Sequence, residues 1–168
     1  MKKIFCLMMG TALLAAPALA GNIDISANAG LFTAPGGVGS STMYGVSATQ
    51  PLTDNVSVRA SLQSTTYTVA GQSTTFTPVS LDVIYSQLLP GGLRPYAGMG
   101  VSYNSVSGGG STSQTTGAQA EVGVNYNFGP LSAGVEYRYM IPDLNNSSAS
   151  ATAFNGSVTG SVFQSISF

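Results

Sequence analysis

The sequence lacks several residue types on which common protein chemistry depends. It contains no His and no Trp, and its single Cys is Cys6. Without His there is no imidazole for a catalytic triad, for a metal site or for the usual general base. Residues 21–168 contain no Cys, so neither a disulfide framework nor a thiolate metal centre can form there. We therefore expect no cofactor and no enzymatic activity.

Charge is also scarce. Charged residues make up 7% of the chain, against about 25% in an ordinary soluble domain. Both Lys residues lie at positions 2 and 3, and three Arg against six carboxylates give residues 21–168 a net charge of −3. No basic stripe is available for a nucleic acid. No stretch after residue 20 approaches about 18 consecutive apolar residues, which excludes transmembrane helices.

The first 20 residues have the pattern of a secretory signal peptide. Lys2 and Lys3 form a positive start, Ile4 to Ala16 form a short apolar core, and Ala18-Leu19-Ala20 give a cleavage pattern of small residues. The apolar run is shorter than the roughly 20 residues that a membrane helix needs. We expect cleavage after Ala20, which leaves residues 21–168 as one domain.

The rest of the chain alternates between apolar residues and small or polar ones, a period of two that is typical of β-strands. Eight such segments can be identified, each near the roughly 9–11 residues of a tilted membrane strand. They are 22–32, 42–50, 55–67, 75–87, 95–106, 116–128, 131–141 and 153–168. Phe76 and Pro78 fall out of phase in the fourth, which predicts a bulge or a later start there.

Only helices and closed barrels satisfy every backbone polar group inside a bilayer. An export signal, low charge and eight alternating segments therefore predict an all-β fold, an eight-stranded antiparallel up-and-down transmembrane β-barrel. Compact turns are expected at 51–55, 90–92 and 129–130, and longer loops at the opposite rim. The expected loops are 35–41, 70–74, 107–114 and 142–150. This arrangement predicts that both termini lie on the periplasmic side of the bacterial outer membrane, with the loops open to a surface ligand.

The charged residues of the predicted strands all lie at the polar positions of the alternation, which we call the polar parity, so none should face lipid. They are Asp24, Arg59, Asp82, Glu121, Glu136 and Arg138. A turn at Gly129-Pro130 sets Glu121 opposite Arg138, close enough for a salt bridge. A turn at Ala70-Gly71 likewise sets Arg59 opposite Asp82. The two Arg cannot neutralise four carboxylates, so we expect Asp24 and Glu136 to be hydrated, partly protonated or shared in a network.

Two interpretations of these inner charges are open. The functional one is a gate or an ion path. The other is a structural network of Arg59, Asp82, Glu121, Glu136 and Arg138 that fills the lumen. An eight-stranded barrel has room for side chains rather than for an open channel, which favours the structural network.

The chain ends on a strictly alternating segment, Ser157 to Phe168, in which Gln164 is the one departure from an apolar outer face. Three segments resemble the small eight-stranded barrels that include the outer membrane protein A transmembrane domain and the opacity-type surface proteins. They are this last segment, Arg94-Pro95-Tyr96-Ala97-Gly98-Met99-Gly100-Val101 and Gly134-Val135-Glu136-Tyr137-Arg138-Tyr139. The resemblance implies contact with outer-membrane lipids and with the barrel-insertion machinery through Phe168.

The resemblance also implies a function, a non-enzymatic surface protein that supports envelope integrity or makes contacts through its loops. The alternative is a narrow passive pore or a conduit for a small ligand. The barrel enzymes that act on lipids or peptides each rely on an active-site His, which this sequence does not contain.

Overall fold

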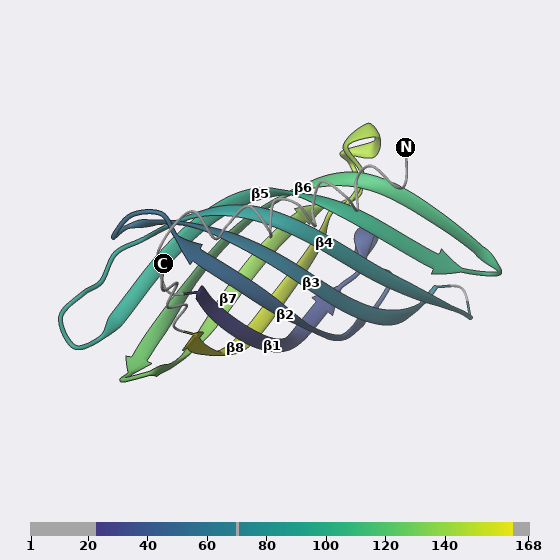
Figure 1. The fold of residues 1–168 in the computed structure, drawn as a ribbon. Helices are drawn as coiled ribbons and strands as arrows, with labels where there is room; N and C mark the ends of the chain where they lie inside the picture. Colours follow the sequence, from purple (N-terminus) through teal and green to yellow (C-terminus); the bar gives the residue numbers. More distant parts are fainter. Residues whose placement is uncertain (1–22, 70, 163–168) are drawn as a thin grey trace, which may run out of the picture.

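The computed structural model describes residues 23–69 and 71–162, and most of them lie in eight antiparallel strands. Each strand pairs with the next, and β1 pairs with β8, which closes the barrel (Figure 1). The strands are β1 (Ile23–Thr33), β2 (Ser40–Pro51), β3 (Val56–Val69), β4 (Gln72–Ser86), β5 (Leu93–Gly108), β6 (Ser111–Phe128), β7 (Leu131–Ile141) and β8 (Ala151–Val162). The predicted fold class is confirmed.

Two short 3-10 helices, η2 (Pro35–Gly37) and η3 (Leu144–Asn146), lie in the β1–β2 and β7–β8 connections. Within the described residues, no helix is long and apolar enough to cross a membrane. The predicted signal peptide and the end of the predicted last strand, including Phe168, lie outside the described residues.

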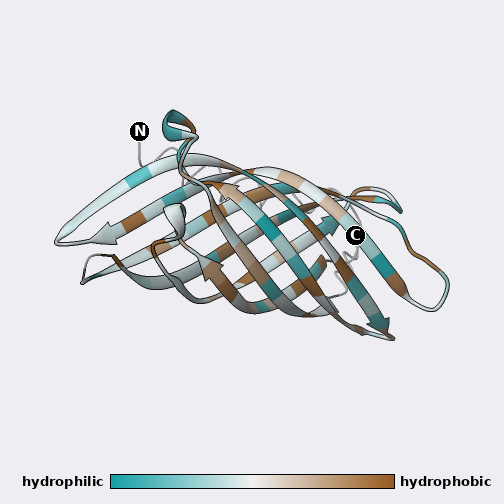
Figure 2. Ribbon diagram, turned by 180° about the vertical axis from the view of Figure 1, so that it is seen from behind, coloured by the Kyte–Doolittle hydropathy of each residue, from teal (hydrophilic) through white to brown (hydrophobic). Residues whose placement is uncertain are grey.

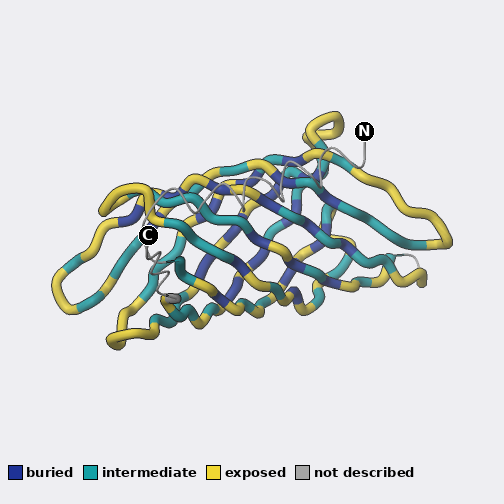
Figure 3. Tube along the Cα trace, in the orientation of Figure 1, coloured by how far each residue is buried: buried dark blue, intermediate teal, exposed yellow. Residues whose placement is uncertain are grey.

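The two faces of the barrel wall differ in the way that the alternation predicts (Figures 2 and 3). Large apolar side chains are exposed on the outside, with Met99 at 72%, Leu31 at 64% and Val158 at 59%. Polar side chains are buried inside, and Asp82 and Asn104 are almost fully enclosed. A continuous apolar outer surface with a polar interior is the arrangement of a barrel surrounded by lipid.

The barrel has two rims, which we name by their connections. The turn rim carries Ile23, Val162 and the connections 52–55, 87–92 and 129–130, and the loop rim carries 34–39, Gly71, 109–110 and 142–150. Two of the four predicted loops are therefore wrong, because 72–74 and most of 107–114 are strand. The Ser, Thr and Gly content of these segments suggested loops, but Thr is β-branched and well suited to strands.

The predicted bulge at Phe76 and Pro78 is also wrong. β4 keeps one register against β3 from Val69↔Gln72 to Val56↔Tyr85, and one register against β5 throughout. Phe76 and Pro78 are instead buried on the inner face, in phase with Ser80 and Asp82. The break in the pattern marked apolar side chains that point into the barrel.

Candidate functional site

The interior of the barrel is the candidate site, and its chemistry changes along the axis. A polar cavity, which we call the vestibule, occupies the half next to the turn rim. Four ionised side chains, the ion cluster, lie at its inner end: Arg59, Glu121, Glu136 and Arg138. A cluster of apolar residues, the apolar plug, lies in the half next to the loop rim: Phe32, Ala34, Met43, Phe76, Met140, Ala151 and Ala153.

In the ion cluster, each arginine contacts both glutamates. Arg59 Nη2 pairs with Glu121 Oε2 and lies 2.6 Å from Glu136 Oε2. Arg138 Nη2 lies 2.9 Å from Glu121 Oε2 and 2.9 Å from Glu136 Oε1. All four side chains are at most 12% exposed. Two positive and two negative charges therefore cancel in a site with little water, where an unpaired charge would be costly.

Neighbouring polar side chains hold the ion cluster in place. Arg138 Nη1 donates to Gln63 Oε1 at 2.9 Å, and Arg138 Nε donates to Glu136 Oε1 at 3.1 Å. The guanidinium of Arg59 lies 5.7 Å from the centre of the Tyr96 ring, a cation–π distance. The Tyr96 hydroxyl donates to Glu136 Oε2 at 2.9 Å. The inward-facing residues of β3, β5, β6 and β7 thus form one connected network.

A glycine makes the Tyr96 contact possible. Tyr96 on β5 lies opposite Gly123 on β6, and Gly123 lies opposite Glu136 on β7. A Cβ atom at Gly123 would lie 2.4 Å from the Tyr96 ring, so the ring crosses β6 only because this position has no side chain. Glycine in a strand often marks such a close approach.

Asp82 has different partners from those that the sequence predicted. It lies opposite Arg59 in the β3–β4 register, but its carboxylate accepts from Gln119 Nε2 at 2.6 Å and from Ser80 Oγ at 3.0 Å. The predicted ion pair is therefore wrong, because the long Arg59 side chain reaches across the lumen to β6 and β7. The Asp82 carboxylate packs against Gly100. A Cβ atom at Gly100 would lie 2.2 Å from Asp82 Oδ1.

The register of Glu121 opposite Arg138 is as predicted. Glu136 is shared between both arginines, one of the arrangements expected for the surplus carboxylates. Asp24 lies apart from the ion cluster, near the turn rim, where Ser161 Oγ donates to its Oδ1 at 2.5 Å. The sequence does not single out three further residues of the interior network: Gln63, Tyr96 and Gln119. Each lies at a polar position of the alternation in its strand.

The apolar plug is built around two stacked rings. The Phe32 and Phe76 ring centres are 5.4 Å apart, and Tyr67 lies 5.7 Å from Phe32. Phe32 and Met43 are fully buried, and Phe76 and Met140 are 2% exposed. Apolar side chains packed in this way offer no hydrogen-bonding partner to water.

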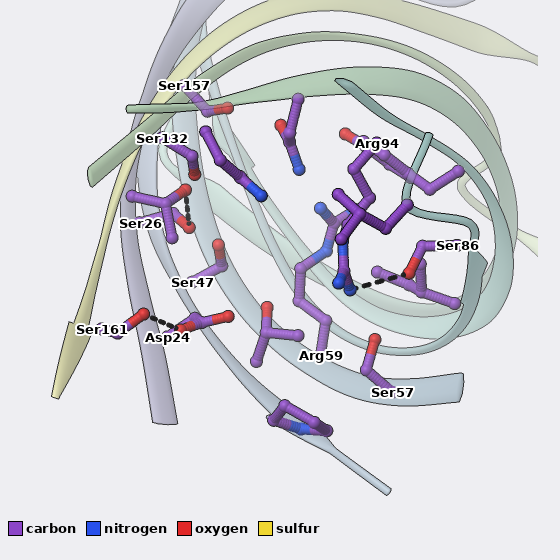
Figure 4. A pocket seen from close by; sticks show the side chains of 18 of the residues that line it. Asp24, Ser26, Ser47, Ser57, Arg59, Ser86, Arg94, Ser132, Ser157 and Ser161 are labelled. Atoms are coloured by element: carbon purple, nitrogen blue, oxygen red, sulfur yellow. Dashed lines mark hydrogen bonds between the residues drawn. The ribbon is translucent and has the colours of Figure 1, made fainter. Parts of the chain in front are cut away.

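The vestibule has a volume of about 810 Å³ and is lined by all eight strands (Figure 4). Its wall is rich in hydroxyl groups: Ser26, Ser47, Thr49, Thr53, Ser57, Ser86, Ser132, Ser157, Thr159 and Ser161. Arg94 reaches into it and donates to Ser86 Oγ at 3.4 Å. Its inner end is formed by Arg59, Tyr96, Glu136, Arg138 and Asn155.

The carboxylates of the ion cluster are paired with arginines. In the part of the chain that the structure describes, no group of three or more His, Cys, Asp or Glu side chains is placed to hold a metal ion. The glutamates of the ion cluster are each engaged by two arginines.

Sequence comparison places the chain in a known family. The family model for the outer membrane protein beta-barrel domain matches residues 4–161. The chain belongs to this family. Its apolar outer surface therefore faces lipid, and its location is the bacterial outer membrane. No curated protein sequence matches the chain significantly.

Solved structures support the same fold. Neisserial surface protein A superposes with a TM-score of 0.72 at 20% identity, covering 82% of this chain and 96% of that one. The N-terminal barrel domain of Pseudomonas aeruginosa OprF gives 0.64 at 25% identity, covering 84% and 98%. Ail of Yersinia pestis, in complex with the heparin analogue sucrose octasulfate, gives 0.63 at 11% identity, covering 86% and 100%.

Proposed function

We propose that this protein is a non-enzymatic surface protein, in which a closed barrel serves as an anchor and the loop rim makes the functional contacts. The observation that supports this most is that the lumen is blocked. The ion cluster and the apolar plug occupy successive levels of the interior. A barrel closed in this way offers no through passage, so its useful surface is the one that it presents beyond the membrane.

The loop rim presents a projecting β-sheet made by β3, β4, β5 and β6. The β2–β3 ladder reaches only Met43↔Thr65, and the β6–β7 ladder begins at Ala118↔Ile141. Residues 66–69 and 111–117 are therefore paired on one side only, and each forms a sheet edge. Exposed edges can accept an additional strand from a partner. Neither edge carries the Lys or Pro that commonly protects such strands.

The charge of this surface favours uncharged partners. Residues 60–81 and 95–120, which include the projecting strands, contain no charged residue. A strongly anionic ligand such as the one seen with Ail would find no basic group there. We propose contacts through backbone hydrogen bonds and the Ser, Thr and Gln side chains of these strands.

Shortening the projecting hairpin tests this role. Deleting Ser105–Ser107 together with Thr112–Gln114 removes three facing residue pairs and keeps the Gly109-Gly110 turn. We expect the variant to fold, as shown by heat-modifiable gel mobility, and to lose surface binding or envelope resistance to detergents. If every such phenotype of intact cells is unchanged, the proposal fails.

The alternative function, a narrow pore, has one supporting observation, the vestibule that enters half of the barrel. The apolar plug beyond it opposes conduction. Refolded protein in planar bilayers should therefore show no discrete conductance. Reproducible single-channel steps would favour the pore over the surface role.

We also propose that residues 1–20 are removed on export, that the turn rim faces the periplasm, and that Phe168 directs insertion. The family membership supports export to the outer membrane. Replacing Phe168 with Ser should lower the amount of barrel inserted in cells. An equal replacement at exposed Phe128, Phe128→Ser, controls for lost aromatic surface.

A further inference from the structure

The projecting β-sheet has one side, which we call the outer face, that continues the lipid-facing surface of the barrel. The opposite side carries Tyr67 and Val106, which pack against the apolar plug. Residues of the other parity therefore point outward, on the same side as the exposed Leu62 and Val101. The two hairpins of this sheet extend past the other connections of the loop rim, so the outer face reaches beyond the rest of the barrel (Figure 1).

The chemistry of the outer face changes along the strands. The pairing register sets the outward residues of β3, β4, β5 and β6 in rows across the sheet. One row is apolar: Ala60, Leu81, Val101 and Ala118. Six residues further along each strand, a row near the hairpin turns bears four hydroxyl groups: Thr66, Thr75, Ser107 and Thr112. The outer face therefore passes from apolar to hydroxyl-rich within a short distance.

This change falls at the level where the hydrocarbon of the membrane ends. On β6 the outward residues from Phe128 to Ala118 are apolar or aromatic, over ten residues of strand. Ten residues cover about 33 Å along a strand, and a tilt of about 40° reduces this to about 25 Å along the barrel axis. An apolar band of about 25 Å is the height found in outer-membrane barrels. The residues beyond Ala118 therefore lie level with the lipid headgroups.

The absence of charge on this surface selects the kind of headgroup. Residues 60–81 and 95–120 contain no charged side chain. A phosphate or a carboxylate placed against the outer face would find no counter-ion and would lose part of its hydration. An uncharged headgroup is therefore the better match.

The hydroxyl groups of the outer face can accept and donate further hydrogen bonds. Thr66 Oγ1 lies 3.1 Å from Thr75 Oγ1, and Ser107 Oγ lies 3.0 Å from Thr112 Oγ1. A hydroxyl group has one donor hydrogen and two acceptor sites, so each of these pairs leaves capacity for another partner. The hydroxyl groups of a sugar offer the same combination of donors and acceptors.

We propose that the outer face of the projecting β-sheet binds the neutral sugars of a glycolipid of the surrounding membrane. The acyl chains of the same lipid lie against the apolar rows, and its sugars lie against the hydroxyl row. The continuity of the two surfaces on one parity of the same strands supports this occupant. The inference rests on the function proposed above, because it names the partner of one face of the surface that contacts other molecules there.

The test is a titration of the refolded barrel in phosphatidylcholine nanodiscs with digalactosyldiacylglycerol, a lipid with an uncharged disaccharide headgroup. Backbone amide NMR shifts of residues 73–77 and 105–107 measure binding, and we expect them to saturate. In the double variant Thr75→Val/Ser107→Ala, the lipid fraction at half-saturation should rise about fivefold or more, as expected for two lost hydrogen bonds.

The matched control is Thr74→Val/Ser113→Ala, which makes the same two changes on the opposite side of the same hairpins. It should change the lipid fraction at half-saturation by less than about twofold. A second titration uses phosphatidic acid, which has a phosphate and no sugar, and should give no saturable shift. Shifts that do not saturate with the glycolipid, an equal response to phosphatidic acid, or equal losses in the two double variants would overturn the proposal.

Failure of this proposal can be distinguished from failure of the proposed function. Nanodiscs present the same lipids on both sides, so the titration depends neither on the orientation of the barrel nor on a phenotype of cells. If the hairpin deletion alters surface phenotypes but the glycolipid does not bind, only this inference fails. If the glycolipid binds as expected but the deletion leaves every phenotype unchanged, the proposed function fails.

Discussion

The two halves of the barrel interior come from the same strands but differ in chemistry. Towards the loop rim, Phe32, Met43, Phe76 and Met140 are buried in one apolar cluster. Towards the turn rim, hydroxyl and amide side chains surround a cavity of about 810 Å³. The outer surface shows no such division at these levels, since large apolar side chains are exposed beside both halves, such as Leu31 and Val158. The interior is therefore where the sequence could vary most without affecting insertion into the membrane.

This difference shows that one alternating pattern serves two purposes. The outer parity must remain apolar, because a charge facing lipid costs about 2–4 kcal/mol at mid-bilayer for Arg. The inner parity only has to fill or solvate the lumen. Apolar residues on the inner parity close the barrel at one end, and polar residues on the same parity open it at the other.

The largest effect is expected from removing an aromatic ring of the apolar plug. Phe76→Ala leaves a cavity beside Phe32, where no lipid can enter, and should cost about 3–5 kcal/mol of unfolding free energy. The matched control is Phe154→Ala on the lipid face, where 52% of the residue is exposed and lipid can fill the space. Urea unfolding in lipid vesicles measures both. Equal losses would show that the plug is not tightly packed.

The next effect concerns the boundary between the two halves. Glu121→Gln removes one of the two carboxylates that neutralise Arg59 and Arg138 and should cost about 3 kcal/mol. The control Asp54→Asn removes a charge from an exposed turn and should change stability by less than about 0.5 kcal/mol. The same unfolding assay applies. Unchanged stability of Glu121→Gln would refute a structural role for the ion cluster.

The smallest effect is expected at a glycine. Gly123→Ala places a Cβ atom 2.4 Å from the Tyr96 ring, which must then move away from Glu136. We expect a loss of about 1–3 kcal/mol, as for other overpacked sites. Gly156→Ala is the control, since its Cβ atom would meet nothing closer than 3.8 Å. If the two variants are equally stable, Tyr96 does not depend on the gap at Gly123.

The sequence predicted the wall of the barrel well, because alternation is a local property. All eight strands, the inward position of the six strand charges and the Glu121↔Arg138 register follow from parity and from short turns. Contacts across the lumen did not follow. Register identifies only the nearest strand, whereas Arg59 on β3 reaches β6 and β7.

The apolar plug was missed for a related reason. Alternation alone assigns apolar residues to the lipid face, so Phe76 and Pro78 stand out only as an irregularity in the pattern. Phe32 and Met140 show the same departure from the outer parity, on β1 and β7. Together they were a signal of inner packing. Recognising it requires the tilt and pairing of the strands, which bring residues far apart in sequence to one level.

The most direct test of the divided interior is the reactivity of single cysteines on one strand. Ala153 and Ser157 share the inner face of β8, but Ala153 is 1% exposed in the plug and Ser157 lines the vestibule. In folded protein in vesicles, Ser157→Cys should react rapidly with a small charged methanethiosulfonate reagent. Ala153→Cys should react more slowly by about two orders of magnitude or more, a gap that corresponds to at least about 2.7 kcal/mol of restricted access. Similar rates at both positions would show a water-filled lumen and contradict the account.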